Sequence, residues 1–260
     1  MVFERLHPNT NEWQMYYANH IVRYQFASTI LKDSSIKENI LDIACGVGYG
    51  SAYLESQGIK GITGADISEE AIRIAKTEYK SEHINFIVDD GCNPKHFNQK
   101  KYNAIVSFET IEHLKQPDLL LKNFKNCGNE NCQLIISSPN VLVTGHTQKK
   151  DWHFHEKEYS PIEFLQLFKN LGYKSIKFYG QGYSKYGISR NEIRSELNRI
   201  HFNPFMRLGE AIQRIIRGAK FGPVLPEKNE DFEIIEFNNA ESIEKLGKHG
   251  PFVLIYVLSM

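Results

Sequence analysis

The sequence has no excess of either charge and no long apolar run. Its 260 residues contain 31 Lys and Arg against 31 Asp and Glu, so no net field attracts nucleic acid and we expect no nucleic-acid partner. No stretch approaches the ~20 apolar residues of a membrane span, and the first residues lack the apolar core of a signal peptide. We therefore expect a cytoplasmic protein with at most peripheral membrane contact.

Cysteine is also scarce. The four cysteines show no Cys-x-x-Cys spacing, which favours reduced thiols over zinc sites or disulfides. Internal repeats and low-complexity tracts are absent as well. The length then allows one large α/β domain, or one such domain with an elaborated cap.

The most informative segment is a glycine-rich turn at residues 41–50, Leu-Asp-Ile-Ala-Cys-Gly-Val-Gly-Tyr-Gly. A short apolar run ends there in Asp42, breaks into glycines at 46, 48 and 50, and leads into a helix start. Strand, glycine turn and helix form a nucleotide site in an open α/β sheet. The third glycine comes one residue early for a dinucleotide fingerprint, and Asp42 would repel a pyrophosphate but suit an amino-bearing ligand.

Acids also end the next predicted strands. Asp66 ends a strand at 61–68, about twenty residues beyond the glycine turn, where a carboxylate can accept both ribose hydroxyls. Asp90 follows a strand at 84–88 and could receive an adenine amino group. Further strands at 102–107 and 133–138 complete a pattern that predicts a doubly wound parallel sheet.

These motifs, in this order, resemble those of class I S-adenosylmethionine-dependent methyltransferases. The resemblance covers roughly residues 12–180, and it is closest to the branch with ubiquinone-biosynthesis O-methyltransferases and methyltransferases of bacterial surface glycans. Residues 19–27 and 107–114 are particularly similar to that branch. The resemblance implies a mostly parallel, seven-stranded, Rossmann-like α/β sheet with an insertion between strands six and seven. It also implies S-adenosylmethionine as cofactor and S-adenosylhomocysteine as product.

The expected organisation has four parts. Residues 1–34 form an N-terminal helical lid, 35–180 the cofactor-binding α/β core, 181–250 an insertion or cap, and 251–260 the final strand. A helix is predicted over 161–172, a sixth strand over 174–180 and a seventh over 251–258. The insertion holds a basic amphipathic stretch at 205–217, interpreted as a cap or homodimer-contact helix, with a membrane-surface helix as the alternative.

The resemblance also implies roles for cofactor-side residues. Asp42 would meet the methionine ammonium, and Arg23 could pair with the methionine carboxylate. Asp66 would take the ribose, and Asp90 with the backbone of Gly91 and Cys92 would take adenine. The full expected set comprises Tyr17, Arg23, Tyr24, Asp42, Ala44, Gly46, Gly48, Asp66, Ile67, Asp90, Gly91, Cys92, Phe108 and Glu109.

On the acceptor side, three histidines are candidates. His113 follows the fourth strand, and His153 and His155 share one face of an extended segment after the fifth. Imidazole titrates near neutral pH and suits a general base for a hydroxyl. We rank the base first, orienting hydrogen bonds second and a metal site third, because His-x-His without a distal ligand is a weak metal signal; no metal is predicted.

The predicted function is methyl transfer to a small-molecule acceptor. O-methylation of a sugar or glycan precursor, such as a nucleotide sugar in surface polysaccharide biosynthesis, is preferred. The alternatives are a quinone or other lipid-like phenol and the nitrogen of an amino sugar. A non-catalytic scaffold is a further alternative, against which the intact acids and glycines argue.

Overall fold

The computed structural model describes residues 11–145, 155–184 and 228–260. Its contacts divide the chain into two compact units. The first unit comprises Met1–Arg5, Arg23–Gly182 and Ile234–Met260, and the second comprises Leu6–Val22 and Tyr183–Glu233. Nearly all of the sheet lies in the first unit. The predicted amphipathic stretch at 205–217 lies outside the described residues.

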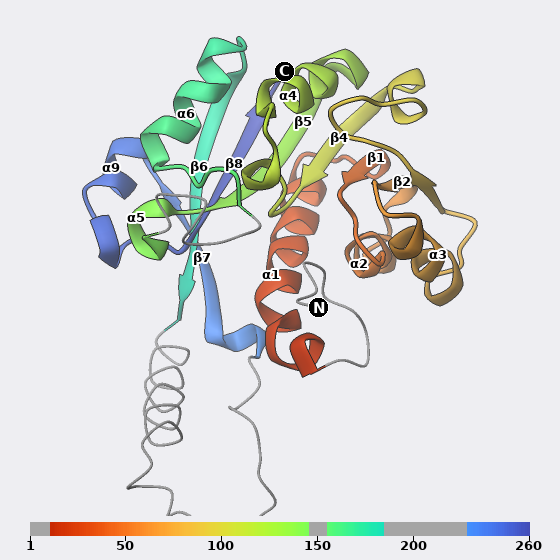
Figure 1. The fold of residues 1–260 in the computed structure, drawn as a ribbon, viewed down its shortest axis with the longest axis horizontal. Helices are drawn as coiled ribbons and strands as arrows, with labels where there is room; N and C mark the ends of the chain where they lie inside the picture. The colour runs from red at the N-terminus through yellow and green to blue at the C-terminus, as the bar shows by residue number, and fades with distance from the viewer. Residues whose placement is uncertain (1–10, 146–154, 185–227) are drawn as a thin grey trace, which may run out of the picture. The chain divides into compact units, whose positions relative to one another are not determined.

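The core of the first unit is an eight-stranded sheet (Figure 1). Its strand order is β3-β2-β1-β4-β5-β8-β6-β7. The pairs from β3 to β5 are parallel, whereas β8 is antiparallel to both β5 and β6. The strands are β1 (Glu38–Ile43), β2 (Lys60–Asp66), β3 (Ile84–Val88), β4 (Tyr102–Ser107), β5 (Gly128–Pro139), β6 (Lys174–Tyr183), β7 (Phe232–Phe237) and β8 (Val253–Ser259).

The prediction of a doubly wound, mostly parallel sheet is confirmed, but the predicted count of seven strands is wrong. The additional strand is β7, whose sequence Phe-Glu-Ile-Ile-Glu-Phe lies inside the predicted insertion. A strand at the edge of a sheet keeps only part of its side chains buried. The glutamates of β7 and the half-exposed Ile235 therefore gave no clear apolar alternation.

Helices connect the strands, and their ends carry recognisable caps. Ser160 caps α6 in a capping box with Glu163, and Ser68 accepts a hydrogen bond from the backbone at the start of α3. The α-helices are α1 (Asn11–Asp33), α2 (Tyr49–Ser56), α3 (Glu69–Glu78), α4 (Pro117–Cys127), α5 (Val141–Thr144), α6 (Pro161–Asn170) and α9 (Ala240–Glu244). Short 3₁₀ helices are η1 (Phe97–Gln99), η2 (Ile111–His113), η3 (Asn229–Asp231) and η4 (Gly247–His249).

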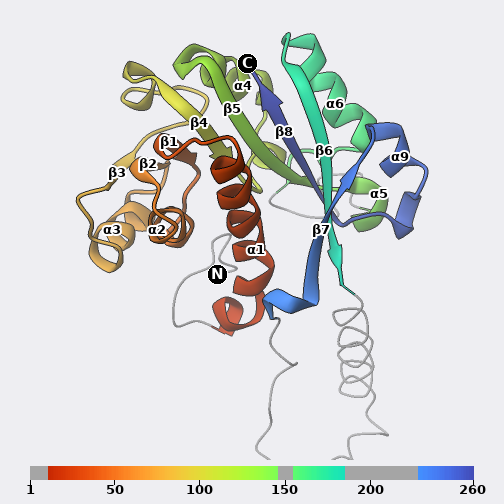
Figure 2. The ribbon, with the colours of Figure 1, turned by 180° about the vertical axis from the view of Figure 1, so that it is seen from behind.

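Strand alternation gives the sheet two different faces. Leu41 and Ile43 of β1 belong to a large apolar cluster that also contains Phe124 of α4 and Phe168 of α6. Between them Asp42 points to the other face, where α2 and the Arg23–Asp33 part of α1 pack. Figures 1 and 2 show α4 and α6 on one side of the sheet and the Arg23–Asp33 part of α1 on the other.

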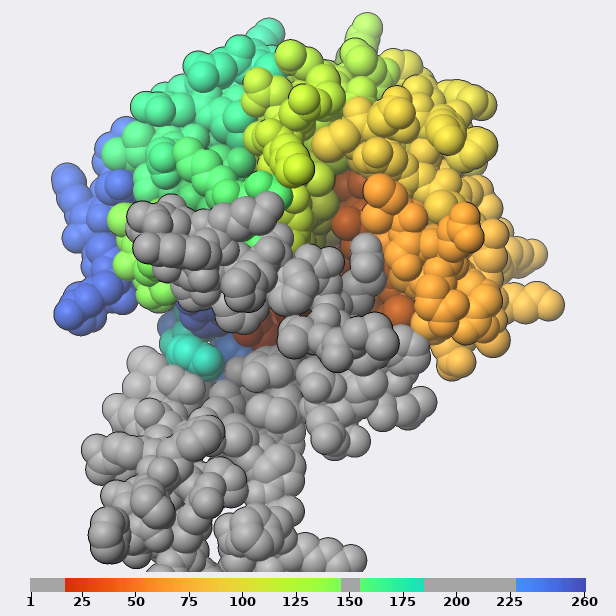
Figure 3. Space-filling view, viewed as in Figure 1, coloured from red at the N-terminus to blue at the C-terminus, as the bar shows by residue number. Residues whose placement is uncertain are grey.

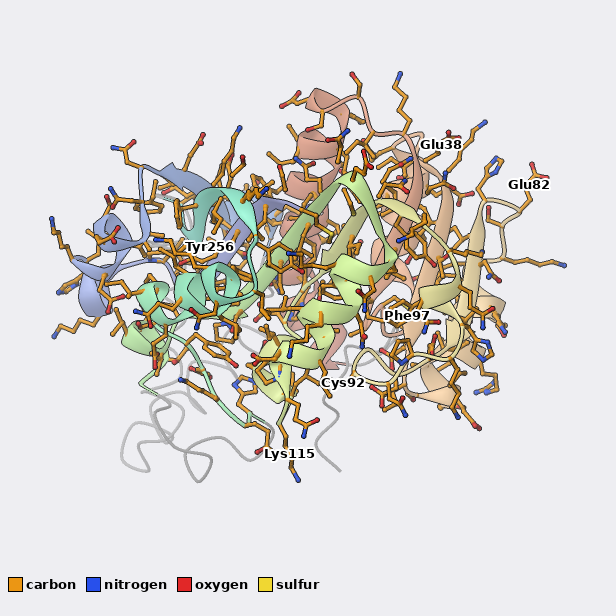
Figure 4. The ribbon with its side chains drawn as sticks, turned by 90° about the horizontal axis from the view of Figure 1, so that it is seen from above. Glu38, Glu82, Cys92, Phe97, Lys115 and Tyr256 are labelled. Atoms are coloured by element: carbon orange, nitrogen blue, oxygen red, sulfur yellow. The ribbon has the colours of Figure 1, made fainter. Side chains whose placement is uncertain are left out.

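The carboxyl ends of the parallel strands all lie at one edge of the sheet. Since β1 pairs with both β2 and β4, the strand order reverses next to it, and ligands of open α/β sheets bind at such a point. Glu38 at the start of β1 and Cys92 and Lys115 beyond β3 and β4 lie on opposite sides of Figure 4. Within the described segments, no helix is long and apolar enough to cross a membrane.

Candidate active site

In the turn after β1, every second residue has a positive φ angle. Ala44, Gly46 and Gly48 have φ of 58°, 56° and 90°. A Cβ on Gly46 would meet nothing within 4 Å, whereas one on Gly48 would lie 2.7 Å from the ring of Phe86. Gly46 therefore faces open space at the end of β1, and Gly48 allows α2 to start close against β3.

Asp42 lies fully buried beneath this turn. Its carboxylate accepts hydrogen bonds from the Tyr24 hydroxyl at 3.1 Å and from Ser51 Oγ at 2.6 Å. Burial raises the pKa of the Asp42 carboxyl to about 7, although both hydrogen bonds oppose the shift and only nearby Asp66 adds to it. The Tyr24 ring fits because a Cβ on Gly50 would lie 1.9 Å from it. The role of Ser51 was not predicted from the sequence, where its only signal is a small polar residue in the first turn of α2.

Asp66 joins the ends of β1 and β2 through both of its oxygens. One oxygen accepts a hydrogen bond from the Gly46 N–H at 3.0 Å, and the other accepts one from the Ser68 N–H at 2.9 Å. The following residue, Ile67, is 63% exposed. Asp66 thus fixes the glycine turn, beside an apolar side chain that the protein leaves uncovered.

The two acids after β3 have different roles. Asp89 accepts hydrogen bonds from four backbone N–H groups, those of Asp90, Lys95, His96 and Phe97. Burial raises the pKa of the Asp89 carboxyl, but these donors outweigh it and the net pKa lies below the ordinary value. Asp90 is half-buried and accepts one hydrogen bond, from the Cys92 N–H at 2.8 Å. Asp89 therefore holds the loop that presents Asp90, a role that the sequence analysis did not assign.

The remaining cofactor-side candidates lie on different elements. Arg23 is buried, with Nη1 2.9 Å from Oε1 of Gln181. The Tyr24 ring packs edge-on against Phe108, with ring centroids 5.0 Å apart. A Cβ on Gly91 would lie 2.7 Å from a Leu120 methyl group, which indicates close packing there. Tyr17 belongs to the second unit, so its expected contact with the cofactor stays a prediction.

Beyond β4, the chain turns sharply at Glu109. This residue has a left-handed φ of 49°, an unusual conformation for a side chain other than glycine. Two contacts with Ser137 of β5 hold it, because the Ser137 hydroxyl accepts from the Glu109 N–H and lies 2.7 Å from its carboxylate. The Glu109 side chain is thereby fixed next to the end of β5.

Glu112 is the most unusual residue of this segment. Its side chain is fully buried, yet neither carboxylate oxygen has a hydrogen-bond partner among the described residues. Burial, with the nearby charge of Glu109, raises the pKa of the Glu112 carboxyl well above its ordinary value. Buried polar groups are normally paired, so a carboxylate in this state requires an explanation. Glu112 was not among the site residues predicted from the sequence.

Two of the candidate histidines lie beside Glu112. The rings of His113 and His155 pack edge to face with centroids 4.7 Å apart, and His113 Nε2 is 3.8 Å from Glu112 Oε1. The His155 Nδ1 atom is 2.6 Å from Oε1 of Glu158, whose other oxygen accepts a hydrogen bond from Thr144. In Figure 3 the yellow-green part of the chain, which includes α4, lies at the surface between the yellow and the green parts. The third candidate, His153, lies outside the described residues.

The backbone explains how these residues meet. The Glu112 carbonyl accepts hydrogen bonds from the N–H groups of Glu156 and Lys157, at 2.8 and 3.1 Å. The segment after β4 is therefore tied to the segment that carries His155. Ligand atoms of Glu112, His113 and His155 lie within 4.8 Å of one another, close enough to share a metal ion.

Comparison with known proteins agrees with this geometry. The model of a family described as a methyltransferase domain matches residues 14–177. The structure also resembles the methyltransferase domain of bacterial CtHen1, with a TM-score of 0.56 and 18% identity over 94% of this chain and 100% of that one. Magnesium protoporphyrin IX methyltransferase from Synechocystis PCC 6803, solved with bound SAH, has a TM-score of 0.54 and 16% identity. The match covers 69% of this chain and 84% of that one.

The curated relatives that match this chain include both O-methyltransferases and N-methyltransferases. A ubiquinone biosynthesis O-methyltransferase from Rickettsia typhi is 26% identical over 76% of this chain and 84% of its own length. Phosphoethanolamine N-methyltransferase 1 from Arabidopsis thaliana is 22% identical over 54% of this chain. That match spans only 29% of the Arabidopsis protein's own length. A second match, to a ubiquinone biosynthesis O-methyltransferase from Glaesserella parasuis, spans 62% of that protein's length.

The fold and the family match define a Rossmann-like, class I methyltransferase. The chain belongs to the methyltransferase-domain family, whose methyl donor is S-adenosylmethionine. The resemblance stated from the sequence is thereby confirmed for family, fold and cofactor.

Proposed function

We propose that this chain transfers the methyl group of S-adenosylmethionine to a hydroxyl oxygen of a small molecule, with a sugar or glycan precursor as the preferred acceptor. The observation that carries this proposal is the pairing of two sets of side chains at the carboxyl edge of one sheet. Asp42, Gly46 and Asp66 form the donor side, and Glu112, His113 and His155 form the acceptor side.

The donor side suits the parts of S-adenosylmethionine. Asp42, ionised, offers a negative charge to the methionine ammonium, and the open space beside Gly46 leaves room for the methionine moiety. Asp66, at the carboxyl end of β2, would accept ribose hydroxyls, and the exposed Ile67 beside it would offer an apolar surface to adenine. Asp90, Gly91 and Cys92 would contact the adenine edge, and Arg23 and Tyr24 the methionine end.

The acceptor side suits a hydroxyl better than an amine. The sulfonium already activates the methyl group, so an amine that is neutral when bound needs only correct placement in line with the methyl carbon. A sugar hydroxyl keeps its proton at neutral pH and gains from a group that removes it. Two histidines beside buried carboxylates supply groups of this kind. The cluster of Glu112, His113 and His155 therefore favours O-methylation.

A phenol is the second candidate acceptor. Several curated relatives are ubiquinone biosynthesis O-methyltransferases, including the one from Rickettsia typhi. A phenol ionises near pH 10 and depends less on assistance than an aliphatic hydroxyl does. The two candidates thus differ in how strongly turnover should depend on the cluster.

A labelled-donor experiment tests the proposal. Purified protein would receive S-adenosylmethionine with a labelled methyl group and, in parallel, nucleotide sugars, catechol-type phenols and phosphoethanolamine. We expect label in a sugar product, and a loss of roughly 10²–10⁴-fold in turnover for His155→Gln with cofactor affinity unchanged. Label only in phosphoethanolamine would contradict O-methylation, and label only in the phenol would replace the sugar by the second candidate.

A further inference from the structure

We propose that Glu112, His113 and His155 hold a divalent first-row metal ion that binds the acceptor hydroxyl. This inference rests on the proposed function for its chemistry, but not for the existence of the site. It replaces the metal-free site predicted from the sequence. Three residues from two distant segments bring one carboxylate oxygen and two ring nitrogens within 4.8 Å of one another.

The first argument is the state of Glu112. A fully buried carboxylate with no hydrogen-bond partner among the described residues is costly, because nothing replaces the water that it has lost. Its neighbours add to the problem, since Glu109 and Glu158 contribute further negative charge and Arg23 offsets only part of it. A divalent cation would satisfy Glu112 and balance this excess of negative charge.

The second argument is the way His155 is held. Its Nδ1 lies 2.6 Å from the Glu158 carboxylate, which is itself buried and accepts a hydrogen bond from Thr144. A proton on Nδ1 leaves the lone pair on Nε2. Metal-binding histidines are commonly oriented by a carboxylate in this way. Glu158 is then a positioning residue for His155.

The third argument is the donor set. Two imidazoles and one carboxylate make a three-ligand set that leaves coordination positions for substrate, as catalytic rather than structural metal sites do. Imidazole favours first-row transition ions over Ca²⁺. This donor set could not be recognised from the sequence. His155 is far from His113 along the chain, and Glu112 and His113 are direct neighbours, which is not a metal-ligand spacing.

The chemistry that follows is a balanced methyl transfer. A cation held by Glu112, His113 and His155 would make a bound acceptor hydroxyl more acidic, so that its proton would pass to solvent. The oxygen lone pair then forms a bond to the methyl carbon while the carbon–sulfur bond breaks, and that electron pair stays on sulfur. Hydroxyl and sulfonium thus give methyl ether, thioether and one proton. In the metal-loaded site the cation would therefore take over the part in proton removal that the proposed function gives to His113 and His155, and the cluster would still favour a hydroxyl acceptor.

Mn²⁺ binding tests the proposal without any acceptor. Chelator-treated full chain would be titrated with Mn²⁺, and the free ion followed by electron paramagnetic resonance. We expect one Mn²⁺ per chain, and at least tenfold weaker binding in His113→Ala, His155→Ala and, through orientation, Glu158→Gln. The matched control is His83→Ala, because His83 lies 3.7 Å from the exposed Glu82 in a similar Glu-His pair without a second histidine. Its Mn²⁺ affinity should be unchanged.

Glu112→Gln separates binding from a structural role. Removing the buried charge should leave the melting temperature of the metal-free protein unchanged or higher, yet abolish its rise on addition of Mn²⁺. Wild-type protein that binds no Mn²⁺, or cluster variants that bind it as tightly as wild type, would overturn the proposal.

Binding of S-adenosylhomocysteine in the presence of chelator, measured by calorimetry, keeps the two proposals apart. Product bound without any Mn²⁺ site overturns the metal site and leaves the methyltransferase. A Mn²⁺ site without product binding supports the metal site and contradicts the proposed function.

Discussion

At the scale of single residues, Asp42 is the proposed partner of the methionine ammonium, and its charge depends on pH near neutrality. Its carboxyl is buried between Tyr24 and Ser51, and its pKa is raised to about 7. The raised pKa means that the folded, ligand-free protein holds this proton more tightly than the unfolded chain does. The contribution of Asp42 to stability therefore falls as the pH rises from the ordinary carboxyl range to about 7.

The first prediction is a pH-dependent affinity for the cofactor. A methionine ammonium favours ionised Asp42, so below pH ~7 the dissociation constant of S-adenosylhomocysteine should rise by about tenfold per pH unit. Above that pH it should level off. Calorimetry across pH 5–8, in two buffers of different ionisation enthalpy, would show the released proton. Asp42→Asn should bind weakly at every pH, and an equally flat profile in the wild type would contradict the contact.

The second prediction concerns Asp66. Asp66→Ala should weaken binding of the cofactor product by about 2–3 kcal/mol, because a charged acceptor for ribose hydroxyls is lost. It should also lower stability, since the N–H groups of Gly46 and Ser68 lose their acceptor. Asp118→Ala, which removes an exposed acid in the first turn of α4, is the control and should leave the affinity unchanged, at a cost in stability of at most about 1 kcal/mol. Unchanged affinity in Asp66→Ala would remove Asp66 from the ribose site.

At the scale of elements, the glycine turn after β1 allows two effects of a substitution to be distinguished, backbone strain and loss of space for a ligand. Gly46 and Gly58 both have positive φ, and a Cβ on either would meet nothing within 4 Å. The third prediction is that Gly46→Ala and Gly58→Ala lose similar stability, about 1–2 kcal/mol, from strain alone. Cofactor affinity, measured by calorimetry, should fall only in Gly46→Ala. Equal affinities in the two variants would mean that the cofactor does not approach Gly46.

The loop after β3 gives a similar contrast between neighbouring residues. The fourth prediction is that Asp89→Ala lowers the free energy of unfolding by about 3 kcal/mol at neutral pH, because buried N–H groups lose a charged acceptor. Asp90→Ala should cost less stability but weaken cofactor binding. Since the pKa of Asp89 is lowered, its contribution should be lost as the pH falls below the ordinary carboxyl range. Urea unfolding at pH 7 and pH 3 measures both effects.

At the scale of the whole molecule, Asn140 connects segments that are remote in sequence. Its backbone and side-chain N–H groups donate to the carbonyls of Phe252 and Pro251, and its Oδ1 caps α5. It also bridges to Tyr159, four residues beyond His155. The fifth prediction is that Asn140→Ala lowers the free energy of unfolding by about 2–4 kcal/mol, measured with denaturant. Asn98→Ala, at an exposed position of η1, should change it by less than ~0.5 kcal/mol.

Sequence patterns predicted most of the sheet, because apolar strands and the glycine turn are local signals. The predicted strands at 102–107, 133–138 and 251–258 correspond to β4, β5 and β8. The arrangement around Glu112 could not be predicted from the sequence. Its burial and its proximity to His155 depend on hydrogen bonds between two segments that are distant along the chain. The role of Asp89 was missed for a related reason: which of two adjacent acids faces inward depends on the loop that folds over it.

Most of the proposed donor residues, those from Asp42 to Cys92, lie on one uninterrupted stretch of chain, with Arg23 and Tyr24 of α1 as the exceptions, whereas the acceptor cluster draws on segments beyond β4 and β5. This separation has an evolutionary consequence. Mutations after Pro139 can reshape what is methylated while the stretch that binds the methyl donor stays intact. A library of variants confined to residues 141–160 should therefore yield altered acceptor preference with retained cofactor affinity, which makes this region the natural starting point for directed evolution.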